Sequence, residues 1–496
     1  MTMSVIATLI LGGALIAQLG HPERRVTELN AAGPGTGISA GEPIPGESAG
    51  TEGTTETTAG GATIGSPGGS TSAASPTGTG AAATGGTKTG AAAGKAKSPT
   101  PAAGTRTAAG GTPATSKAGP APAAPGPAGP SPDNPDQGVA SDFITVGGIY
   151  DETGPVDATV ERDTVRSYFN QVNTAGGING RKLRLLDCDS AFDPSRAHQC
   201  AQRLLSQKIL SIVGWTSPSG EEPETKFFTQ QGVPVIGGLS VPAEFSSPLA
   251  FPTMASLAVH GTAMGRHAKD IGIQKPGIIV LNLPFVAPVK DNLLKALHES
   301  GIQETSVEEV DATKADYTDL VIKLQAAGAK SVLGALDPFS YARMYQAMQR
   351  QNWNVPTFGF GLDKKSANDA YGSAVEGAES LMPFIEAFDP AVQSDPGVQE
   401  YFGAVSRYYP NQAKNLDVYT EAQWVAAKVF VEALKRIKGP ITRQSLVASL
   451  ETIKDFKPGL IRSISYAPGN HDPNRCFVWI KNKGHAWHTY SDYQCF

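Results

Sequence analysis

The chain has 496 residues and a formal net charge of -5 at pH 7, with basic and acidic residues mixed along its second part. A nucleic-acid-binding protein would carry a clustered basic face, so this composition argues against that class. Between about residues 30 and 138, Gly, Ala, Thr, Ser and Pro predominate and large apolar residues are scarce. Such a segment cannot bury enough apolar surface to offset its chain entropy, so we predict a disordered linker over residues 30–140.

An apolar run from Val5 to Leu19 stands in the N-terminal segment, residues 1–29. Its length is that of a signal-peptide core and is short for a membrane span. No Lys or Arg precedes it, whereas Arg24 and Arg25 follow it, which is unusual for a secretory signal. A cleaved signal and a retained anchor both remain open, and both predict an extracytoplasmic protein that is secreted or associated with the membrane or cell wall.

Four cysteines favour the same compartment. They form two local pairs, Cys188 with Cys200 and Cys476 with Cys495. An even number of cysteines with local pairing is typical of disulfides in an oxidising space. Zinc is the alternative, because three histidines lie near the second pair: His471, His485 and His488. Their irregular spacing fits neither a zinc knuckle nor a metalloprotease helix, so we predict two disulfides and no metal.

After residue 140 the chain alternates between strand-like and helix-like segments. The predicted strands are Phe143 to Ile149, Leu183 to Cys188, Ile209 to Gly214, Gly232 to Gly237, Gly277 to Leu281, Ser331 to Leu336 and Thr357 to Phe360. Predicted helices include Arg162 to Asn173, one that opens at Asp193, Lys290 to Glu299 and Ser340 to Gln351. This alternation predicts an α/β fold of parallel sheets covered by helices, and its length predicts two lobes.

Near the C-terminus the pattern changes to short antiparallel strands. These are predicted at Leu460 to Ser465, Cys476 to Lys481 and Ala486 to Tyr490, with turns at Asn470 to Asn474 and Asn482 to Gly484. Asparagine and glycine are typical turn residues because they tolerate a left-handed backbone.

Ligands of open parallel sheets bind beyond the carboxyl ends of the strands. There the first strand leads into Tyr150, the third into Trp215 to Ser219, and the fourth into Gly238 to Ser240. Hydroxyls and free backbone N–H groups in these loops suit a polar, anionic group. Ser219 is also placed to cap a helix with acids in its first turn, so capping alone and capping with ligand contact are equal alternatives.

No arrangement typical of an enzyme is found in the sequence. Ser219 has no recognisable His and Asp partners, and neither a nucleophile elbow nor a phosphate-binding loop occurs. Asp151 and Glu152 are neighbours on a strand and face opposite sides, so they do not share a site. We interpret His198 and His267 as residues on helix surfaces. We therefore expect no catalysis and no cofactor.

Several longer motifs follow one another in a distinctive order. They are ITVGGIYDETGPV (144–156), NTAGGINGRKL (173–183), DCDSAFDPSRAHQCAQRLL (187–205), SIVGWTSPSGEEP (211–223) and GVPVIGGLSVPAEF (232–245). In these motifs the chain resembles the type I periplasmic binding proteins, specifically the leucine/isoleucine/valine-binding branch. The resemblance implies two doubly wound parallel-sheet lobes with a ligand cleft between them that closes by a hinge motion. Lobe 1 would comprise residues 141–257 and 385–453, and lobe 2 residues 258–384 and 454–496.

The resemblance also implies ligand-binding positions. In that family, main-chain N–H groups and hydroxyls of the first lobe hold the carboxylate of an amino acid. The matching residues are Ser217, Pro218, Ser219, Gly238 and Ser240. The family's acid for the amino group falls near Gly361, whereas the nearest carboxylate, Asp363, stands two residues later and is followed by two lysines. Tyr150 and Tyr419 are further candidates.

This resemblance implies a solute-binding protein of an ABC-type importer that captures an amino-acid-like or carboxylate ligand and hands it to a membrane permease. The alternative is a ligand-sensing or cell-wall-associated receptor that signals to a partner. We expect a monomer that has no metal, no cofactor and no nucleic-acid partner.

Overall fold

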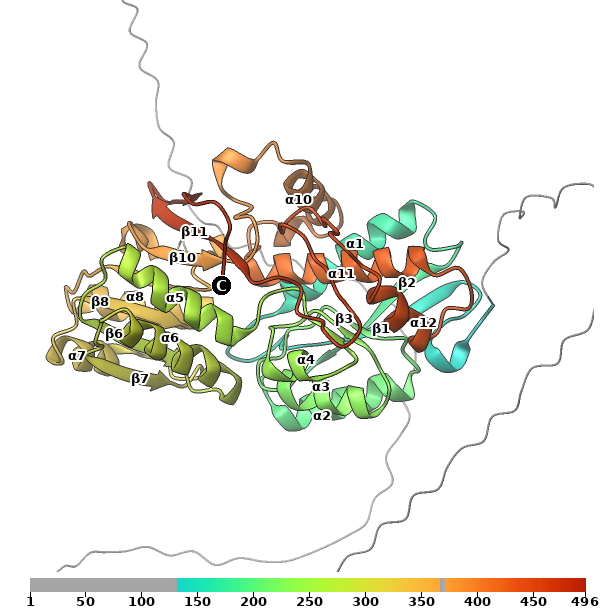
Figure 1. Ribbon diagram of the computed structural model, residues 1–496, viewed down its shortest axis with the longest axis horizontal. Coiled ribbons are helices and arrows are strands. Elements are labelled where there is room, and N and C mark those ends of the chain that lie inside the picture. Colours follow the sequence, from blue (N-terminus) through green and yellow to red (C-terminus); the bar gives the residue numbers. More distant parts are fainter. Residues whose placement is uncertain (1–131, 366–368, 370) are drawn as a thin grey trace, which may run out of the picture. The chain divides into compact units, whose positions relative to one another are not determined.

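The first of two sheets is built from the N-terminal part of the described chain. A computed structural model describes residues 132–365, 369 and 371–496. Five parallel strands are arranged in the order β2-β1-β3-β4-β5 (Figure 1). They are β1 Phe143–Tyr150, β2 Lys182–Asp189, β3 Ile212–Val213, β4 Val235–Ile236 and β5 Ala250–Phe251. All but the first residue of β1 are buried, as is typical of a parallel sheet covered on both faces.

Helices from two separate parts of the chain cover this sheet. They are α1 Thr159–Thr174, α2 Pro194–Ser206, α3 Glu221–Gln230, α4 Pro242–Ser246, α10 Pro396–Tyr408, α11 Val418–Arg436 and α12 Arg443–Leu450. Helix α2 packs against β1, β2 and α3, whereas α11 packs against β3, β4 and α1. The chain therefore leaves the first sheet after β5 and returns to it with α10.

The second sheet has eight strands. They are β6 Pro276–Leu281, β7 Ser306–Val310, β8 Ser331–Ala335, β9 Thr357–Phe360, β10 Glu379–Met382, β11 Cys476–Lys483, β12 Ala486–Thr489 and β13 Gln494–Cys495. The strands β6 to β10 pair in parallel, and β11 is antiparallel to β10, β12 and β13. Its helices are α5 Leu257–Asp270, α6 Ala287–Glu299, α7 Thr318–Ala326 and α8 Pro338–Arg350, with α5 packed on α6 and α7 on α8.

The predicted α/β class and the order of its elements are confirmed, and the differences lie in their extents. Strands β3 and β4 begin three residues later than predicted and have two residues each, and they end where the backbone turns at Gly214 and Gly237, both of which have positive φ angles. The strand predicted at Leu460 to Ser465 is wrong. That segment forms only an isolated bridge between Phe456 and Ile464, and its apolar side chains are buried in the core instead.

The boundary between linker and folded chain lies before residue 140. Val139 is fully buried and bridges Asn134 and Ile144. A 3-10 turn at Pro135–Gln137 precedes it, and the side chain of Gln137 accepts a hydrogen bond of 2.7 Å from the N–H of Arg443. Residues 134–139 therefore already pack and pair with the folded part of the chain. The apolar segment 1–29 and the linker up to residue 131 lie outside the described residues.

The interpretation of His267 as a helix-surface residue is also wrong. Its ring is buried and stacks on Trp479 at 3.8 Å, nearly parallel. Its Nε2 lies 2.8 Å from the hydroxyl of Tyr490 and 3.6 Å from Glu379. Glu379 comes from β10, and Trp479 and Tyr490 come from the C-terminal segment. All three are far away in sequence, so no helix periodicity could show them.

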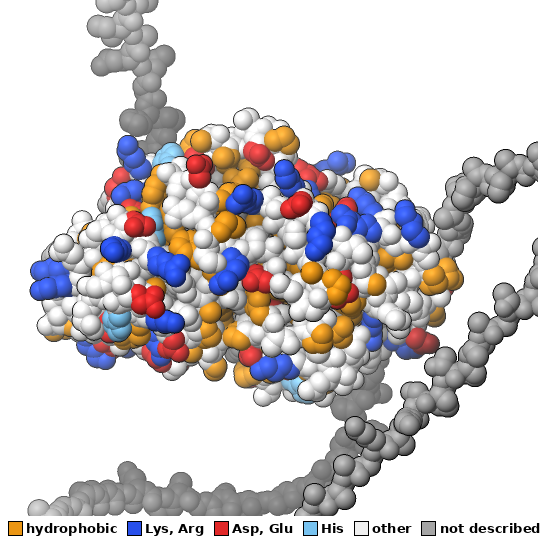
Figure 2. Space-filling model, viewed as in Figure 1, with side chains coloured by type: hydrophobic (Ala, Val, Ile, Leu, Met, Phe, Trp, Pro, Cys, Tyr) orange, Lys and Arg blue, Asp and Glu red, His pale blue; other side chains and the backbone are white. Residues whose placement is uncertain are grey.

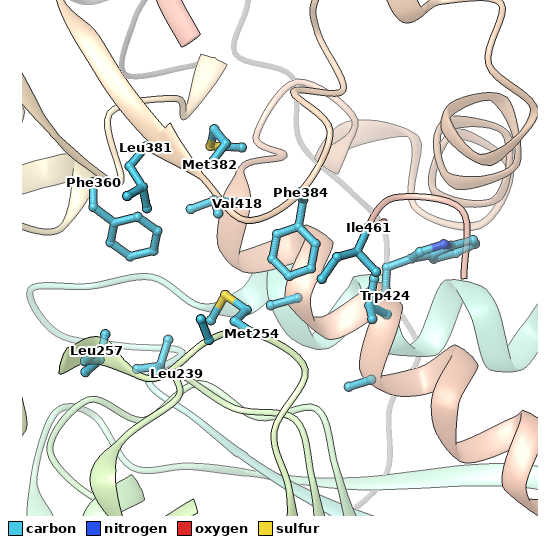
Figure 3. Packing of buried hydrophobic residues seen from close by; sticks show 14 of the residues in the cluster. Leu239, Met254, Leu257, Phe360, Leu381, Met382, Phe384, Val418, Trp424 and Ile461 are labelled. Carbon is cyan, nitrogen blue, oxygen red and sulfur yellow. The ribbon is translucent and has the colours of Figure 1, made fainter. Parts of the chain in front are cut away.

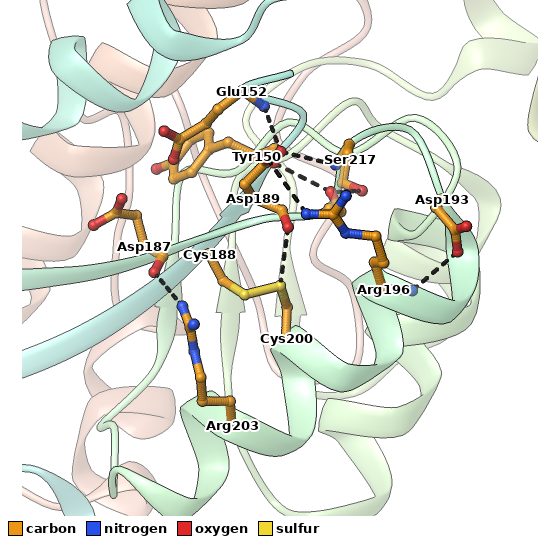
Figure 4. Close-up of a disulfide and its surroundings, with 12 residues drawn as sticks. Tyr150, Glu152, Asp187, Cys188, Asp189, Asp193, Arg196, Cys200, Arg203 and Ser217 are labelled. Atoms are coloured by element: carbon orange, nitrogen blue, oxygen red, sulfur yellow. Dashed lines mark hydrogen bonds and ion pairs between the residues drawn. A yellow bond between two sulfur atoms is a disulfide. The ribbon is translucent and has the colours of Figure 1, made fainter. Parts of the chain in front are cut away.

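Both predicted disulfides are present, Cys188–Cys200 and Cys476–Cys495. The first joins the end of β2 to α2 (Figure 4), and the second joins β11 to β13. With all four sulfurs in disulfides, none is available as a zinc ligand.

The outer surface mixes both signs of charge. On the face shown in Figure 2, Lys and Arg side chains are interspersed with Asp and Glu. Within the described part of the chain, no helix combines the length and apolar character needed to cross a membrane.

Candidate functional site

A pocket lies where the carboxyl ends of the parallel strands of both sheets meet. It encloses about 820 Å³, including the part that opens to solvent. The loops after β1, β2, β3 and β4 contribute Val156, Phe192, Thr216, Pro218 and Leu239. The strands β6 and β9 contribute Leu281 and Phe360, and the segments after β6, β7, β8 and β9 contribute Phe285, Ala312, Leu336 and Lys364. The first turn of α8 contributes Phe339. Because ligands of open parallel sheets bind at this edge, we take this pocket as the candidate site.

Most of the pocket lining is apolar. Leu239 and Leu257 lie on the side of the first sheet and Phe360 on the side of the second (Figure 3). The ring of Phe360 packs edge-to-face against Tyr419, with centroids 5.9 Å apart. Apolar walls on two sides favour a ligand whose body is hydrocarbon, since each contact removes apolar surface from water.

The polar part of the lining centres on a buried ion pair. Lys364 Nζ donates to Asp417 Oδ2 at 2.7 Å and to the carbonyl of Asn415 at 3.0 Å. Asp417 is also the N-cap of α11, where it accepts hydrogen bonds from the N–H groups of Tyr419 and Thr420. Both charged side chains are buried. The first turn of α11 and the loop after β9 are thus joined at the pocket.

Two further carboxyl groups stand beside this pair. Burial raises the pKa of Glu161 to about 8, while Lys364 opposes the rise. Burial and the charge of Asp417 raise the pKa of Asp363 to about 7. Burial alone would lower the pKa of Lys364, but Asp417 and Glu161 outweigh it and the pKa is raised. The lysine is therefore charged, and Glu161 is largely protonated at neutral pH.

A hydrogen-bonded loop presents Phe192 to the pocket. Asp151, fully buried after β1, accepts hydrogen bonds from the hydroxyl of Ser190 at 2.6 Å and from the N–H of Phe192 at 2.8 Å. Ala191 and Phe192 have φ angles of 49° and 59°, a left-handed conformation that costs a non-glycine residue about 1–2 kcal/mol each. Asp151 therefore acts as a structural clamp, and its burial raises its pKa to about 6.

Of the eight ligand-binding residues predicted from sequence, Pro218 and Tyr419 line the pocket. Ser217 lies behind it, with its hydroxyl 2.8 Å from that of Ser190. Ser240 has a φ of 61° and donates to the carbonyl of Met254 at 3.3 Å. Between Gly238 and Ser240, the residue that lines the pocket is Leu239.

The remaining predicted residues are also set back from the lining. Tyr150 is fully buried and its hydroxyl donates to the carbonyl of Gly214. Asp363 Oδ2 accepts a 2.6 Å hydrogen bond from the N–H of Val418. Near the family's acid position, Gly361 has a φ of 86°, and a Cβ there would lie 2.9 Å from the hydroxyl of Tyr419. The glycine thus makes room for the tyrosine.

Ser219 does not cap the following helix, so that prediction is wrong. The N-cap of α3 is Gly220, and the N–H groups of Gly220 and Glu221 donate to the carbonyl of Ser217. The Ser219 hydroxyl has no hydrogen-bond partner among the described residues. It is half-buried and stays a candidate for ligand contact.

Sequence reasoning missed the charged residues of the lining: Asp157, Glu161, Asp337, Lys364 and Asp417. Asp337 and Asp417 are the N-caps of α8 and α11, and a search of the sequence for helix N-caps could have found both. Glu161 stands in the first turn of α1, where an acid is favoured for the helix dipole alone.

Comparison with known proteins identifies the family. The model of the family described as "Periplasmic binding protein" matches residues 144–485. The chain belongs to the type I periplasmic binding proteins, in the leucine/isoleucine/valine-binding family. A leucine-, isoleucine-, valine-, threonine- and alanine-binding protein of Pseudomonas aeruginosa is 27% identical over 261 residues, which are 51% of this chain and 69% of the relative.

Solved structures share the fold at lower identity. A branched-chain amino acid ABC transporter protein of Thermus thermophilus with bound valine has a TM-score of 0.65 and 17% identity, covering 72% of this chain and 98% of its own. An ABC transporter solute-binding protein of R. palustris in complex with benzoate has a TM-score of 0.61 and 15% identity, covering 70% and 96%. This periplasmic binding protein is therefore a solute-binding protein by family.

Proposed function

We propose that this protein captures a small solute with an apolar body in the pocket between its two sheets, outside the cytoplasm, and delivers it to a membrane permease of an ABC importer. The observation that carries the proposal is the pocket, whose walls come from the carboxyl ends of both sheets and are mostly hydrocarbon. Solute-binding relatives with valine or benzoate support a ligand of this size. The protein would bind without catalysis.

Capture would involve closure of two lobes. Lobe 1 would be residues 141–257 and 385–453 and lobe 2 residues 258–384 and 454–496. Three chain segments would connect them and act as the hinge. Closure would remove solvent from the pocket and so strengthen its polar contacts with the ligand.

The proposal predicts that aromatic residues on opposite walls contact the same ligand. Phe192 comes from the loop after β2 of the first sheet and Phe339 from the first turn of α8 on the second sheet, and both are only half-buried. Replacing either by Ala should weaken binding by about 1–2 kcal/mol, roughly 5- to 30-fold, because apolar contact area with the ligand is lost. A thermal-shift screen of small amines, amino acids, amides and carboxylates would supply the ligand, and titration calorimetry would measure its affinity.

Phe402→Ala is the matched control. Phe402 is also half-buried, but it packs on Phe388 and does not line the pocket. Its replacement should leave affinity unchanged. If Phe192→Ala and Phe339→Ala both bound the ligand as tightly as the wild type, the solute would sit outside this pocket. Uptake of the same solute by cells with and without the protein would then test delivery as opposed to sensing.

A further inference from the structure

The side chain of Glu161 is buried at the pocket without a full set of partners. The residue lines the pocket from the first turn of α1 and is only 4% exposed. Its Oε2 has no hydrogen-bond partner among the described residues. A buried carboxyl oxygen without a hydrogen-bond partner is costly in either protonation state, so this group lacks a partner that the described residues do not supply.

The nearby lysine does not fill that gap. Lys364 already donates to Asp417 Oδ2 and to the carbonyl of Asn415. Among the described residues that line the pocket, Lys364 is the single base, whereas four are acids: Asp157, Glu161, Asp337 and Asp417. Even with Glu161 protonated, three aspartates outnumber the one lysine, so the charge balance of this lining is negative and favours a cation over an anion.

The surroundings of Glu161 also limit which kind of cation can bind there. The rest of the lining is mainly hydrocarbon from both sheets, including Leu239, Leu257 and Phe360. A bare, strongly hydrated ion would lose its water against these walls and gain little. An organic cation would place its hydrocarbon there and its charged nitrogen at the carboxylate.

We propose that Glu161 receives the positively charged nitrogen of the solute, which is an ammonium or amidinium group on an apolar body. This inference rests on the proposed function and names its ligand class. The sequence suggested Asp363, in the loop after β9, as the partner of this nitrogen. The inference assigns that role to Glu161 instead, in the first helix that covers the other sheet. Asp363 faces Val418 and is not part of the lining.

Probes with closely matched apolar groups and different charges test the ligand class. Leucine, 3-methylbutylamine, 4-methylpentanamide and 4-methylpentanoate provide a zwitterion, a cation, a neutral molecule and an anion on a branched alkyl group, and benzylamine with benzoate repeats the comparison on a ring. Calorimetry should show each amine binding at least about tenfold more tightly than the carboxylate with the matching apolar group. Tighter binding of both carboxylates would overturn this inference and leave the proposed function standing. Binding by none of the six would overturn both.

Glu161→Gln tests the residue itself. Amine affinity should fall at least about tenfold, while affinity for 4-methylpentanamide should stay within about twofold. Glu224→Gln is the matched control, because Glu224 is a buried glutamate that does not line the pocket. Equal amine affinity in Glu161→Gln and the wild type would contradict the assignment.

The pH dependence of amine binding distinguishes direct contact with the ligand from a purely structural role of Glu161. Burial raises the pKa of Glu161 to about 8, and the charged groups that face it are Lys364, Asp417 and Asp157. Glu161 must lose its proton to pair with the cation, so amine affinity should rise between about pH 6 and about pH 8. The rise should be absent in Glu161→Gln, and its persistence there would contradict the proposal.

Discussion

Replacing Lys364 by Met is expected to destabilise the protein by about 3–5 kcal/mol at pH 7, because it leaves buried carboxylates without their counter-charge. Lys364 is 4% exposed and is bound to Asp417 at 2.7 Å, with Asp363 and Glu161 close enough to raise its pKa. Methionine keeps most of the hydrocarbon length of the side chain, so the loss of stability measures the effect of removing the positive charge. Urea unfolding of the two proteins would measure it.

The loss should also depend on pH. The pKa values of Glu161 and Asp363 are raised to about 8 and about 7 by burial, far above the values of unfolded chains. The folded state therefore holds protons that the unfolded state releases, and this contribution to stability is complete at low pH and is lost as pH rises toward these values. Without Lys364 the carboxylates ionise at still greater cost, so the variant should lose more stability at about pH 8 than at about pH 5.5.

Two further variants separate charge from packing. Lys364→Met combined with Asp417→Asn should be more stable than Lys364→Met alone, because the uncompensated charge is gone and Asn still caps α11. Lys290→Met removes a lysine from an exposed pair with Glu309 and should cost about 0–1 kcal/mol. An equal loss at both pH values, or a double variant no more stable than the single one, would show that Lys364 acts through packing.

The fold could be predicted from the sequence because its signals are local. The apolar run at Thr357–Phe360 and the Asp193–Pro194 start of α2 lie where the pattern placed them. The disulfides followed from short spacing along the chain. Local signals misled at residues 460–465, because the apolar side chains there are buried in the core although the segment does not pair as a strand.

The candidate pocket lies at the edge of the sheets where the sequence predicted the site, but most of the side chains that line it differ from the predicted ones. The loops after β3 and β4 do reach the pocket, yet they present Thr216, Pro218 and Leu239, and turn Ser217 and Ser240 inward. Which side faces the ligand depends on backbone angles such as the positive φ of Ser240, which composition does not reveal. The charged residues of the lining become a group only when α1, α11 and the loop after β9 come together, and their contacts span more than fifty residues of chain.

Removing the disulfide Cys188–Cys200 is expected to lower both stability and ligand affinity. The bond closes a loop with a sequence separation of 12, and in the chain-entropy model such a crosslink contributes about 3 kcal/mol. That loop contains Ala191 and Phe192, the two residues held in left-handed conformations, and Phe192 lines the pocket. Once the link between β2 and α2 is cut, the strained segment keeps the hydrogen bonds from Ser190 and Phe192 to Asp151 and from the N–H of Ala191 to Asp189, but loses its covalent tie to α2.

The double variant Cys188→Ser/Cys200→Ser should therefore unfold about 3 kcal/mol more easily and bind its solute roughly 5- to 10-fold more weakly, as the loop relaxes away from the pocket. The other disulfide provides the comparison. Cys476–Cys495 closes a loop of similar length, with a sequence separation of 19, and neither cysteine lines the pocket. Cys476→Ser/Cys495→Ser should lose similar stability and keep full affinity. Equal affinity loss in both double variants would mean that the disulfides act on binding only through global stability, and that the Phe192 loop does not need the crosslink to hold its shape.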